Sequence, residues 1–311
     1  MLALGGLVVV CAGVVVAGGP IAITRQGMSS FSAAPTENSG DLNARLLDVS
    51  GNARADYWRV ALWMVEREPV VGMGAGSFHR WWLERRTLDQ DVRNAHNLYL
   101  ETLAELGIVG LGLLLAALAV PLSAVRRARR SAGGPVAAAV YSAFLVHAAL
   151  DWDWQIPVIT LIAVACGGAL IALARGDHEV SIAARGRRTA FVLVALAPLI
   201  FAIGVHGGNS RMQAAQDALD QGQARRAVAE ARGARRWMPW AASPWRVTGE
   251  ALTLTGQRQD AVVAFRRALA ANEDDWETWF DLSLVETGMR RTVAFDRARA
   301  LNPRTPEVVD P

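Results

Sequence analysis

The sequence predicts an all-α protein, a polytopic membrane helical bundle of about five spans with an exported helical loop and a C-terminal α-helical domain. Of the 311 residues, 52% are hydrophobic, and they gather in long uncharged runs. In a soluble amphipathic helix, apolar residues instead recur every three to four positions, between polar ones. Arginine clusters lie between the runs, and the end of the chain is polar and alanine-rich. The net charge of +3 on such a chain does not indicate a nucleic-acid partner.

Five apolar runs are long enough to be considered as membrane spans, because about 20 apolar residues cross the bilayer core as a helix. They cover residues 2–23, 106–125, 132–150, 156–174 and 189–205, and the last is the shortest. The first run lacks the positively charged start of a signal peptide, which favours a span over a cleaved leader. We therefore expect residues 1–206 to form a membrane domain.

The arginine clusters predict the orientation, because short arginine-rich loops stay in the cytoplasm. One cluster follows the second run and the other follows the fourth, so both fall on the same side of a five-span bundle. Their members are Arg126, Arg127, Arg129, Arg130, Arg175, Arg185, Arg187 and Arg188. We predict a multi-pass protein of the cytoplasmic membrane, with loop 24–105 and tail 207–311 extracytoplasmic.

The tail contains an internal repeat. Gly222 recurs as Gly256 after 34 residues, and Gly256 recurs as Gly288 after 32. A small residue before a second helix, followed by an Ala/Phe face and an asparagine, resembles the tetratricopeptide pattern, in which helix pairs stack on one another. An ordinary helical bundle is the alternative. Such a tail either binds a protein partner or only packs, and it holds no plausible catalytic cluster.

The exported loop carries an ordered series of residues that ends at the second span. The series is Arg54, Trp58, Pro69, Gly72, Gly74, Gly76, Phe78, His96, Asn97, Tyr99, Leu100, Glu105, Gly107 and Gly110. It resembles the C-terminal half of the O-antigen ligase/polymerase family over roughly residues 1–175. The later stretch 147–157 resembles the next exported hairpin of that family.

This resemblance implies an inverting glycosyltransferase of cell-surface polysaccharide synthesis. It would move a glycan from an undecaprenyl-diphosphate-linked donor to a hydroxyl of a lipid, glycan or protein acceptor, without a cofactor. The family has more spans than this chain, and an upstream arginine in a Ser-Arg-Gly-type element that residues 24–27 echo only weakly. We therefore expect a truncated or partner-dependent half of such an enzyme. The alternative is a non-catalytic, membrane-anchored binding protein with a tetratricopeptide-like tail, the remnant of such an enzyme.

His96 is the expected general base for the acceptor hydroxyl. An imidazole with a pKa of about 6.5 accepts a proton at neutral pH, and His96 lies 10 residues before the apolar run at 106–125. Arg54 is expected to bind the donor diphosphate bidentately and to stabilise the leaving group, since a guanidinium stays charged. Arg59 and Arg93 are the secondary candidates for the diphosphate.

Other residues of the loop are expected to support this chemistry. Gly72, Gly74 and Gly76 would let backbone N–H groups approach the diphosphate, although a plain tight turn is the alternative. Asn97 and Tyr99 flank the predicted base and are assigned a supporting role.

The sequence Asp151-Trp152-Asp153 is a weak candidate for a metal-binding D-x-D element. Tryptophan-rich turns are common at membrane interfaces, so a two-residue match there has little specificity. We expect no metal cofactor.

Overall fold

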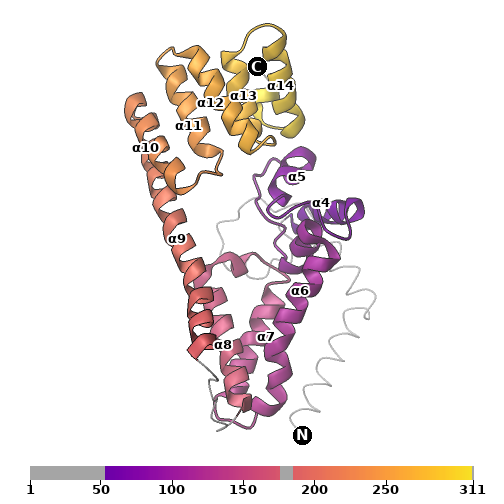
Figure 1. Cartoon of the computed structure of the whole chain (residues 1–311). Coiled ribbons are helices and arrows are strands. Elements are labelled where there is room, and N and C mark those ends of the chain that lie inside the picture. The colour runs from indigo at the N-terminus through magenta and orange to yellow at the C-terminus, as the bar shows by residue number, and fades with distance from the viewer. Residues whose placement is uncertain (1–52, 176–184, 310–311) are drawn as a thin grey trace, which may run out of the picture. The chain divides into compact units, whose positions relative to one another are not determined.

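The computed structural model describes residues 53–175 and 185–309, and every regular element in these ranges is helical (Figure 1). The predicted span at 2–23 lies outside the described residues. By its internal contacts the chain divides into two compact units, Met1–Gly176 and Asp177–Pro311. The domain boundary expected after residue 206 is not tested by this division and stays a prediction.

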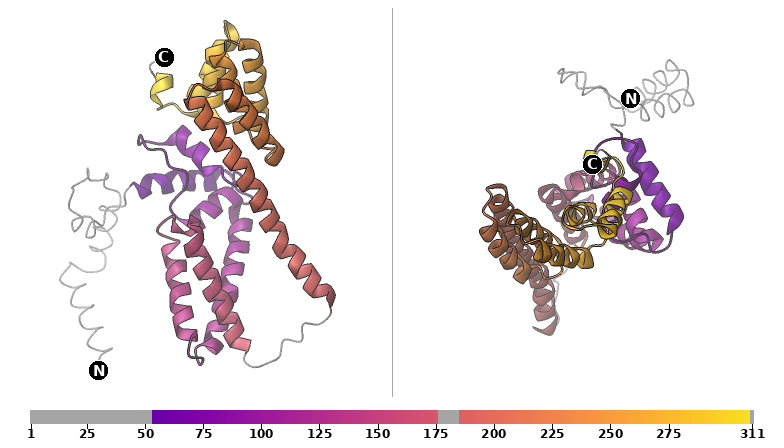
Figure 2. Two further views of the ribbon diagram at one scale, coloured as in Figure 1. Left: turned by 90° about the vertical axis from the view of Figure 1, so that its left-hand side faces the viewer. Right: turned by 90° about the horizontal axis from the view of Figure 1, so that it is seen from above.

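The first unit places two short helices before a helical bundle. Its elements are α4 (Arg54–Arg67), α5 (Phe78–Arg85), α6 (Leu98–Ala128), α7 (Gly134–His147), the 3-10 helix η1 (Asp153–Gln155) and α8 (Pro157–Arg175). In the bundle, α6, α7 and α8 lie side by side (Figure 2). Tyr141 of α7 packs among Ala137, Ala163 and Leu170, and its hydroxyl donates to the Leu118 carbonyl at 3.0 Å.

Within the described residues, α6 and α8 are the helices long and apolar enough to cross a bilayer, with mean hydropathies of 2.4 and 2.3. Their outer faces expose large apolar side chains, such as Leu113 at 70% and Leu161 at 66%. Such faces suit a lipid environment rather than water. Helix α6 contains the run predicted at 106–125, and α8 covers all but the first residue of the run predicted at 156–174.

The run predicted at 132–150 forms a shorter helix than expected. Helix α7 has 14 residues, which at 1.5 Å per residue span about 21 Å, whereas the hydrocarbon core is about 30 Å thick. It begins only at Gly134, where a Cβ atom would fall 1.9 Å from the Ala128 carbonyl oxygen. The run at 189–205 lies within α9 of the second unit, and the total of five spans stays a prediction.

The second unit consists of consecutive helix pairs. Its helices are α9 (Arg185–Asp220), α10 (Ala224–Trp237), α11 (Ser243–Leu254), α12 (Arg258–Ala271), α13 (Trp276–Val285), α14 (Met289–Leu301) and α15 (Pro306–Val309). The recurring glycines lie at the turns inside the pairs, where Gly222, Gly256 and Gly288 have φ of 69°, 74° and 55°. Glycine adopts this left-handed conformation without the steric cost of a Cβ atom. The repeat of sequence is thus a repeat of turns.

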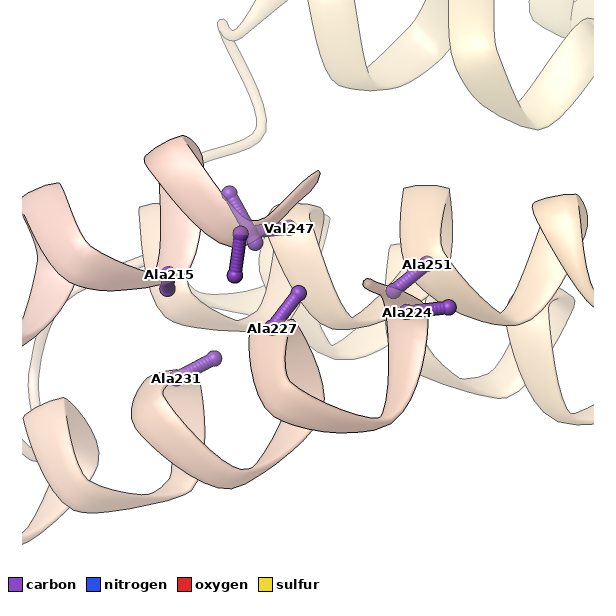
Figure 3. Close-up of a cluster of buried hydrophobic side chains, with 7 residues drawn as sticks. Ala215, Ala224, Ala227, Ala231, Val247 and Ala251 are labelled. Carbon is purple, nitrogen blue, oxygen red and sulfur yellow. The ribbon is translucent and has the colours of Figure 1, made fainter. Parts of the chain in front are cut away.

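Small side chains let the first helices of this unit approach closely. The cluster in Figure 3 contains Ala215, Ala227 and Ala231, and it is completed by Val247 and Ala251 of α11. A separate cluster that includes Phe265 and Leu282 packs the helices that follow. The assignment of the tail to the tetratricopeptide family stays a prediction.

Candidate active site

His96 lies in a strained backbone conformation directly before α6. Its φ is 53°, a left-handed value that side chains other than glycine rarely adopt. The Asn94 side chain accepts a hydrogen bond from the His96 N–H at 3.3 Å and donates one to Gln155 at 3.2 Å. Strain of this kind persists only where the surrounding structure holds it, and it is often found at functional sites.

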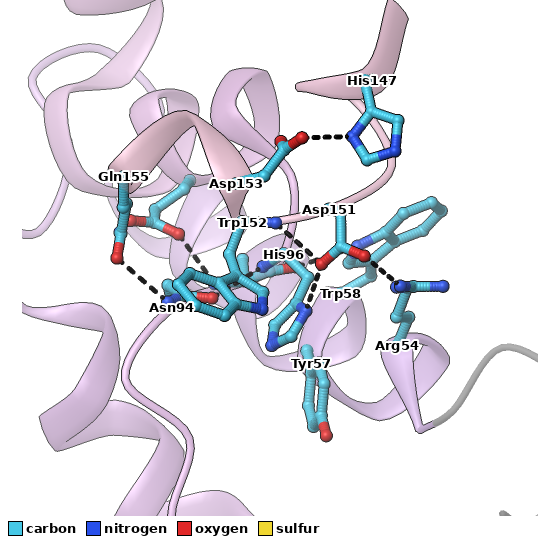
Figure 4. Close-up of polar contacts among 12 residues, drawn as sticks. Arg54, Tyr57, Trp58, Asn94, His96, His147, Asp151, Trp152, Asp153 and Gln155 are labelled. Carbon is cyan, nitrogen blue, oxygen red and sulfur yellow. Dashed lines mark hydrogen bonds and ion pairs between the residues drawn. The ribbon is translucent and has the colours of Figure 1, made fainter. Parts of the chain in front are cut away.

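Asp151 bridges His96 and Arg54 (Figure 4). One carboxylate oxygen lies 3.1 Å from His96 Nδ1, and the other accepts from Arg54 Nη2 at 2.7 Å. The first oxygen also accepts from the Trp152 N–H at 2.8 Å. Residues from three separate parts of the sequence therefore form one polar chain.

The start of α6 holds the hairpin that carries Asp151. The Leu98 N–H donates to the Ala148 carbonyl at 2.8 Å, and the Tyr99 hydroxyl donates to the Leu145 carbonyl at 2.8 Å. The Asn97 side chain caps α6 by accepting from the Leu100 N–H at 2.9 Å. Asn97 and Tyr99 thus support the site structurally, by fixing the positions of His96 and of the hairpin.

Helix α4 covers the other side of the imidazole. The Tyr57 ring lies 5.2 Å from the His96 ring, and Trp58 Nε1 donates to the Ala95 carbonyl at 3.0 Å. The side chains of His96, Asp151 and Arg54 remain 22%, 30% and 23% exposed. The site is therefore partly enclosed but open to a substrate.

This environment keeps His96 neutral at neutral pH. Burial lowers the pKa of His96 below its usual 6.5, and nearby Arg54 lowers it further, against the opposing effect of Asp151. Burial alone would raise the pKa of Asp151, but the Trp152 N–H, Arg54 and His96 outweigh it and hold that pKa below its usual value. A neutral imidazole that donates Nδ1–H to an ionised Asp151 presents Nε2 as a proton acceptor.

The part of the chain that carries Arg54 and His96 is similar to a known family. Residues 2–115 match the model of the O-antigen ligase family. The O-antigen ligase match includes Arg54 and His96 and ends before Asp151. With two apolar helices of spanning length, it indicates a membrane protein and supports a role as a ligase of the glycosyltransferase kind. A search of curated proteins found no match to the chain.

The structure separates the predicted diphosphate-binding arginines. Arg54 contacts Asp151 at the site, whereas Arg59 is 66% exposed and pairs with Asp56 in the same helix. Arg93 is exposed on the segment between α5 and α6, and no described contact joins it to His96. Arg54 is the predicted arginine that the structure brings to the base.

The loop that contains Gly72, Gly74 and Gly76 is hydrogen-bonded to α6. The N–H groups of Gly72, Gly74 and Gly76 donate to the Glu68 carbonyl, the Glu105 carbonyl and the Glu105 carboxylate, at 3.0, 2.9 and 2.8 Å. The same carboxylate accepts from the Phe78 N–H at 3.0 Å. These groups are therefore occupied within the chain, which favours the tight-turn alternative over a diphosphate cradle.

Glycine is required where this loop crosses α6. A Cβ atom on Gly72 would fall 2.2 Å from the backbone carbon of Glu105, and one on Gly107 would fall 2.1 Å from the Val70 carbonyl oxygen. Both glycines have positive φ, and Gly107 forms a kink within α6. The two backbones pack against each other directly, and this contact fixes the first turns of α6.

We expect Gly72→Ala to lower the abundance and the melting temperature of the protein in detergent, because the added methyl group meets rigid backbone. Gly76→Ala is the matched control, since Gly76 has the same φ of 73° and no atom within 4 Å of its Cβ position. The free energy of unfolding of the control should fall only by the steric cost of the left-handed conformation, about 1–2 kcal/mol. Equal melting temperatures for the two variants would contradict the proposed backbone contact.

The two aspartates of the D-x-D element have different partners. Asp151 contacts His96 and Arg54, whereas Asp153 pairs with His147 Nδ1 at 2.7 Å. In the described ranges, no group of three or more histidine, cysteine or acidic side chains is arranged to hold a metal ion. Asp151 is therefore placed to orient the His96 imidazole, and the metal alternative for the two aspartates stays untested.

An open apolar pocket of about 700 Å³ lies among α6, α7 and α8. Its lining includes Leu98, two residues after His96, and Trp154, three residues after Asp151. It continues along α6, α7 and α8 past Tyr141, Phe144 and Gly167. The pocket therefore includes residues close in sequence to His96 and to Asp151, but none of the polar chain itself.

Sequence reasoning missed Asp151 as the partner of His96. The two residues are 55 positions apart, and the aspartate was considered only as a metal ligand. One signal was present, because the hairpin at 147–157 and the loop before α6 were both predicted on the extracytoplasmic side. Shared topology places residues on one face of the membrane but does not select which pair makes contact.

Proposed function

We propose that this chain transfers a glycan from an undecaprenyl-diphosphate-linked donor to an acceptor hydroxyl, with inversion at the sugar carbon. The observation that carries the proposal is the His96–Asp151–Arg54 chain, two of whose members lie in the segment that matches the O-antigen ligases. A neutral histidine held by a carboxylate beside a guanidinium provides both a base and a positive charge.

In the proposed reaction, His96 Nε2 removes the proton of the acceptor hydroxyl as its oxygen attacks the anomeric carbon. The bond from that carbon to the diphosphate oxygen breaks, and the diphosphate leaves with the electron pair. Asp151 keeps the imidazole in the required tautomer and stabilises its charged form. Histidine bases of this kind contribute about 10²–10⁴-fold to rate.

Arg54 would serve two partners in this reaction. One of its nitrogens, Nη2, donates to Asp151, and its buried Nε has no hydrogen-bond partner among the described residues. A guanidinium has five N–H donors, so the diphosphate can bind to those that Asp151 leaves free. Positive charge fixed beside the leaving group stabilises the transition state.

The apolar pocket supports a lipid-linked donor. Its lining includes Leu98 and Trp154, which follow His96 and Asp151 closely in the sequence, and otherwise lies along the apolar helices. An isoprenoid chain lying there would carry its diphosphate to the level of Arg54. The acceptor would approach from the open side of His96.

The pH dependence of transfer tests this assignment. Because burial lowers the pKa of His96, the base should stay neutral and active below the usual 6.5, and the rate should fall only as pH drops through that lowered value. The measurement is the transfer of labelled glycan by membranes of expressing cells, after subtraction of membranes from cells deleted for the gene. Absence of gene-dependent transfer, or an acid limb above pH 6.5, would overturn the proposal.

A further inference from the structure

Two arginines of the second unit lie over one tryptophan. The guanidinium carbons of Arg235 in α10 and Arg267 in α12 are 3.7 and 4.6 Å from the centre of the Trp245 ring in α11. The three residues come from successive helices, which are neighbours in Figure 1. Cation–π contacts of this kind hold guanidinium groups in place.

The described residues do not balance the positive charges of this cluster. Burial lowers the pKa of Arg235, and the two neighbouring charges that lower it further, Arg232 and Arg267, are also positive. No carboxylate among the described residues forms a salt bridge with Arg232, Arg235 or Arg267. Like charges brought together in this way repel one another unless an anion lies between them.

Arg235 also has an unused donor. Its Nη1 atom is buried, and no described protein atom accepts its hydrogen bond. Buried polar atoms usually have a partner, and an unsatisfied one calls for an explanation. Other arginines of this unit do have carboxylate partners, such as Arg211 with Glu230 at 2.9 Å and Arg266 with Glu286 at 2.6 Å.

We propose that Arg235 and Arg267, together with Arg232 three residues before Arg235 on α10, form a binding site for a phosphate or diphosphate group on the tail, with Trp245 as its support. Guanidinium groups bind phosphate oxygens bidentately, and a multiply charged anion compensates several arginines at once. A single carboxylate would neutralise less of this charge. The site is separate from His96 and does not depend on the proposed transfer reaction.

Inorganic pyrophosphate binding to the full chain in a neutral detergent, measured by titration calorimetry, tests the site. The titrations use an Arg54→Gln background, so that binding at the candidate active site does not contribute. Arg235→Gln should weaken binding about tenfold or more, because it removes charge-assisted hydrogen bonds. Arg267→Gln, at an exposed position, should weaken it in the same direction.

Arg225→Gln is the matched control, because Arg225 is an exposed arginine of the same helix α10. It should bind pyrophosphate as the unsubstituted chain does. Micelles that also contain phosphatidylglycerol separate two sources of the phosphate. Weaker pyrophosphate binding in them would identify a lipid headgroup as the occupant, and unchanged binding would identify a soluble phosphate ester. No saturable binding, or an equal loss in Arg225→Gln and Arg235→Gln, would overturn the proposal.

Discussion

Replacing His96 by alanine is expected to reduce glycan transfer about 10²–10⁴-fold, the usual contribution of a general base. The protein should still reach the membrane, because the turns around His96 are held by other residues, such as Asn94 and Asn97. Transfer is measured in membranes that contain equal amounts of each variant. Donor binding should persist, since Arg54 is unchanged.

Two further variants separate loss of the base from loss of structure. His96→Asn keeps a residue type that tolerates the left-handed φ of 53° but is not a general base, so it should be as inactive as alanine. His79 forms an exposed pair with Asp91 at 2.6 Å in the same loop, and His79→Ala should remain active. Substantial activity in His96→Asn would exclude His96 as the base.

Asp151→Asn is expected to reduce transfer by a comparable factor, about 10²–10⁴-fold, because an amide can hold the imidazole in the wrong tautomer and cannot stabilise its charged form. Asp151 raises the pKa of His96 in the intact protein. Its removal should therefore lower that pKa further and move the acid limb of the residual rate to lower pH. A purely structural role for Asp151 would lower the rate without this displacement.

The neighbouring aspartate gives a matched control. Asp153 lies two positions after Asp151 in the same hairpin, and Asp153→Asn removes the charge that pairs with His147. This pair is outside the His96–Asp151–Arg54 chain. We expect it to keep most of the activity and the original pH profile. Equal loss of activity in both variants, together with inhibition of the parent protein by chelators, would favour a metal site at these aspartates.

The fold was predicted best where one physical requirement dominates. The apolar runs at 106–125 and 156–174 became α6 and α8, because a long uncharged run has few alternatives to a membrane helix. The run at 132–150 contains glycines and a histidine near its ends, and there local turns shortened the helix to 14 residues. Apolar composition alone does not show where such a helix begins and ends.

The candidate site was predicted in part. Arg54 and His96 were expected to act together, and the structure joins them through an aspartate 55 residues beyond His96. A contact at that separation depends on how α6 meets the hairpin, which no local pattern encodes. The glycine spacing was equally ambiguous, because a ligand-binding loop can have the same sequence pattern as a loop that packs closely against a helix. In this structure Gly72 allows close backbone packing.

In the proposed reaction, the position of His96 directly before α6 would link the chemistry to the depth of α6 in the bilayer. From Leu98 to Leu106, where the apolar run starts, the helix rises about 12 Å at 1.5 Å per residue. The height of the imidazole above the hydrocarbon is therefore set by the length of one helical segment. Adding a single residue there would raise the base by about 1.5 Å and rotate it by about 100°. In the proposed enzyme, this segment would fix the distance between the membrane and the reacting bond.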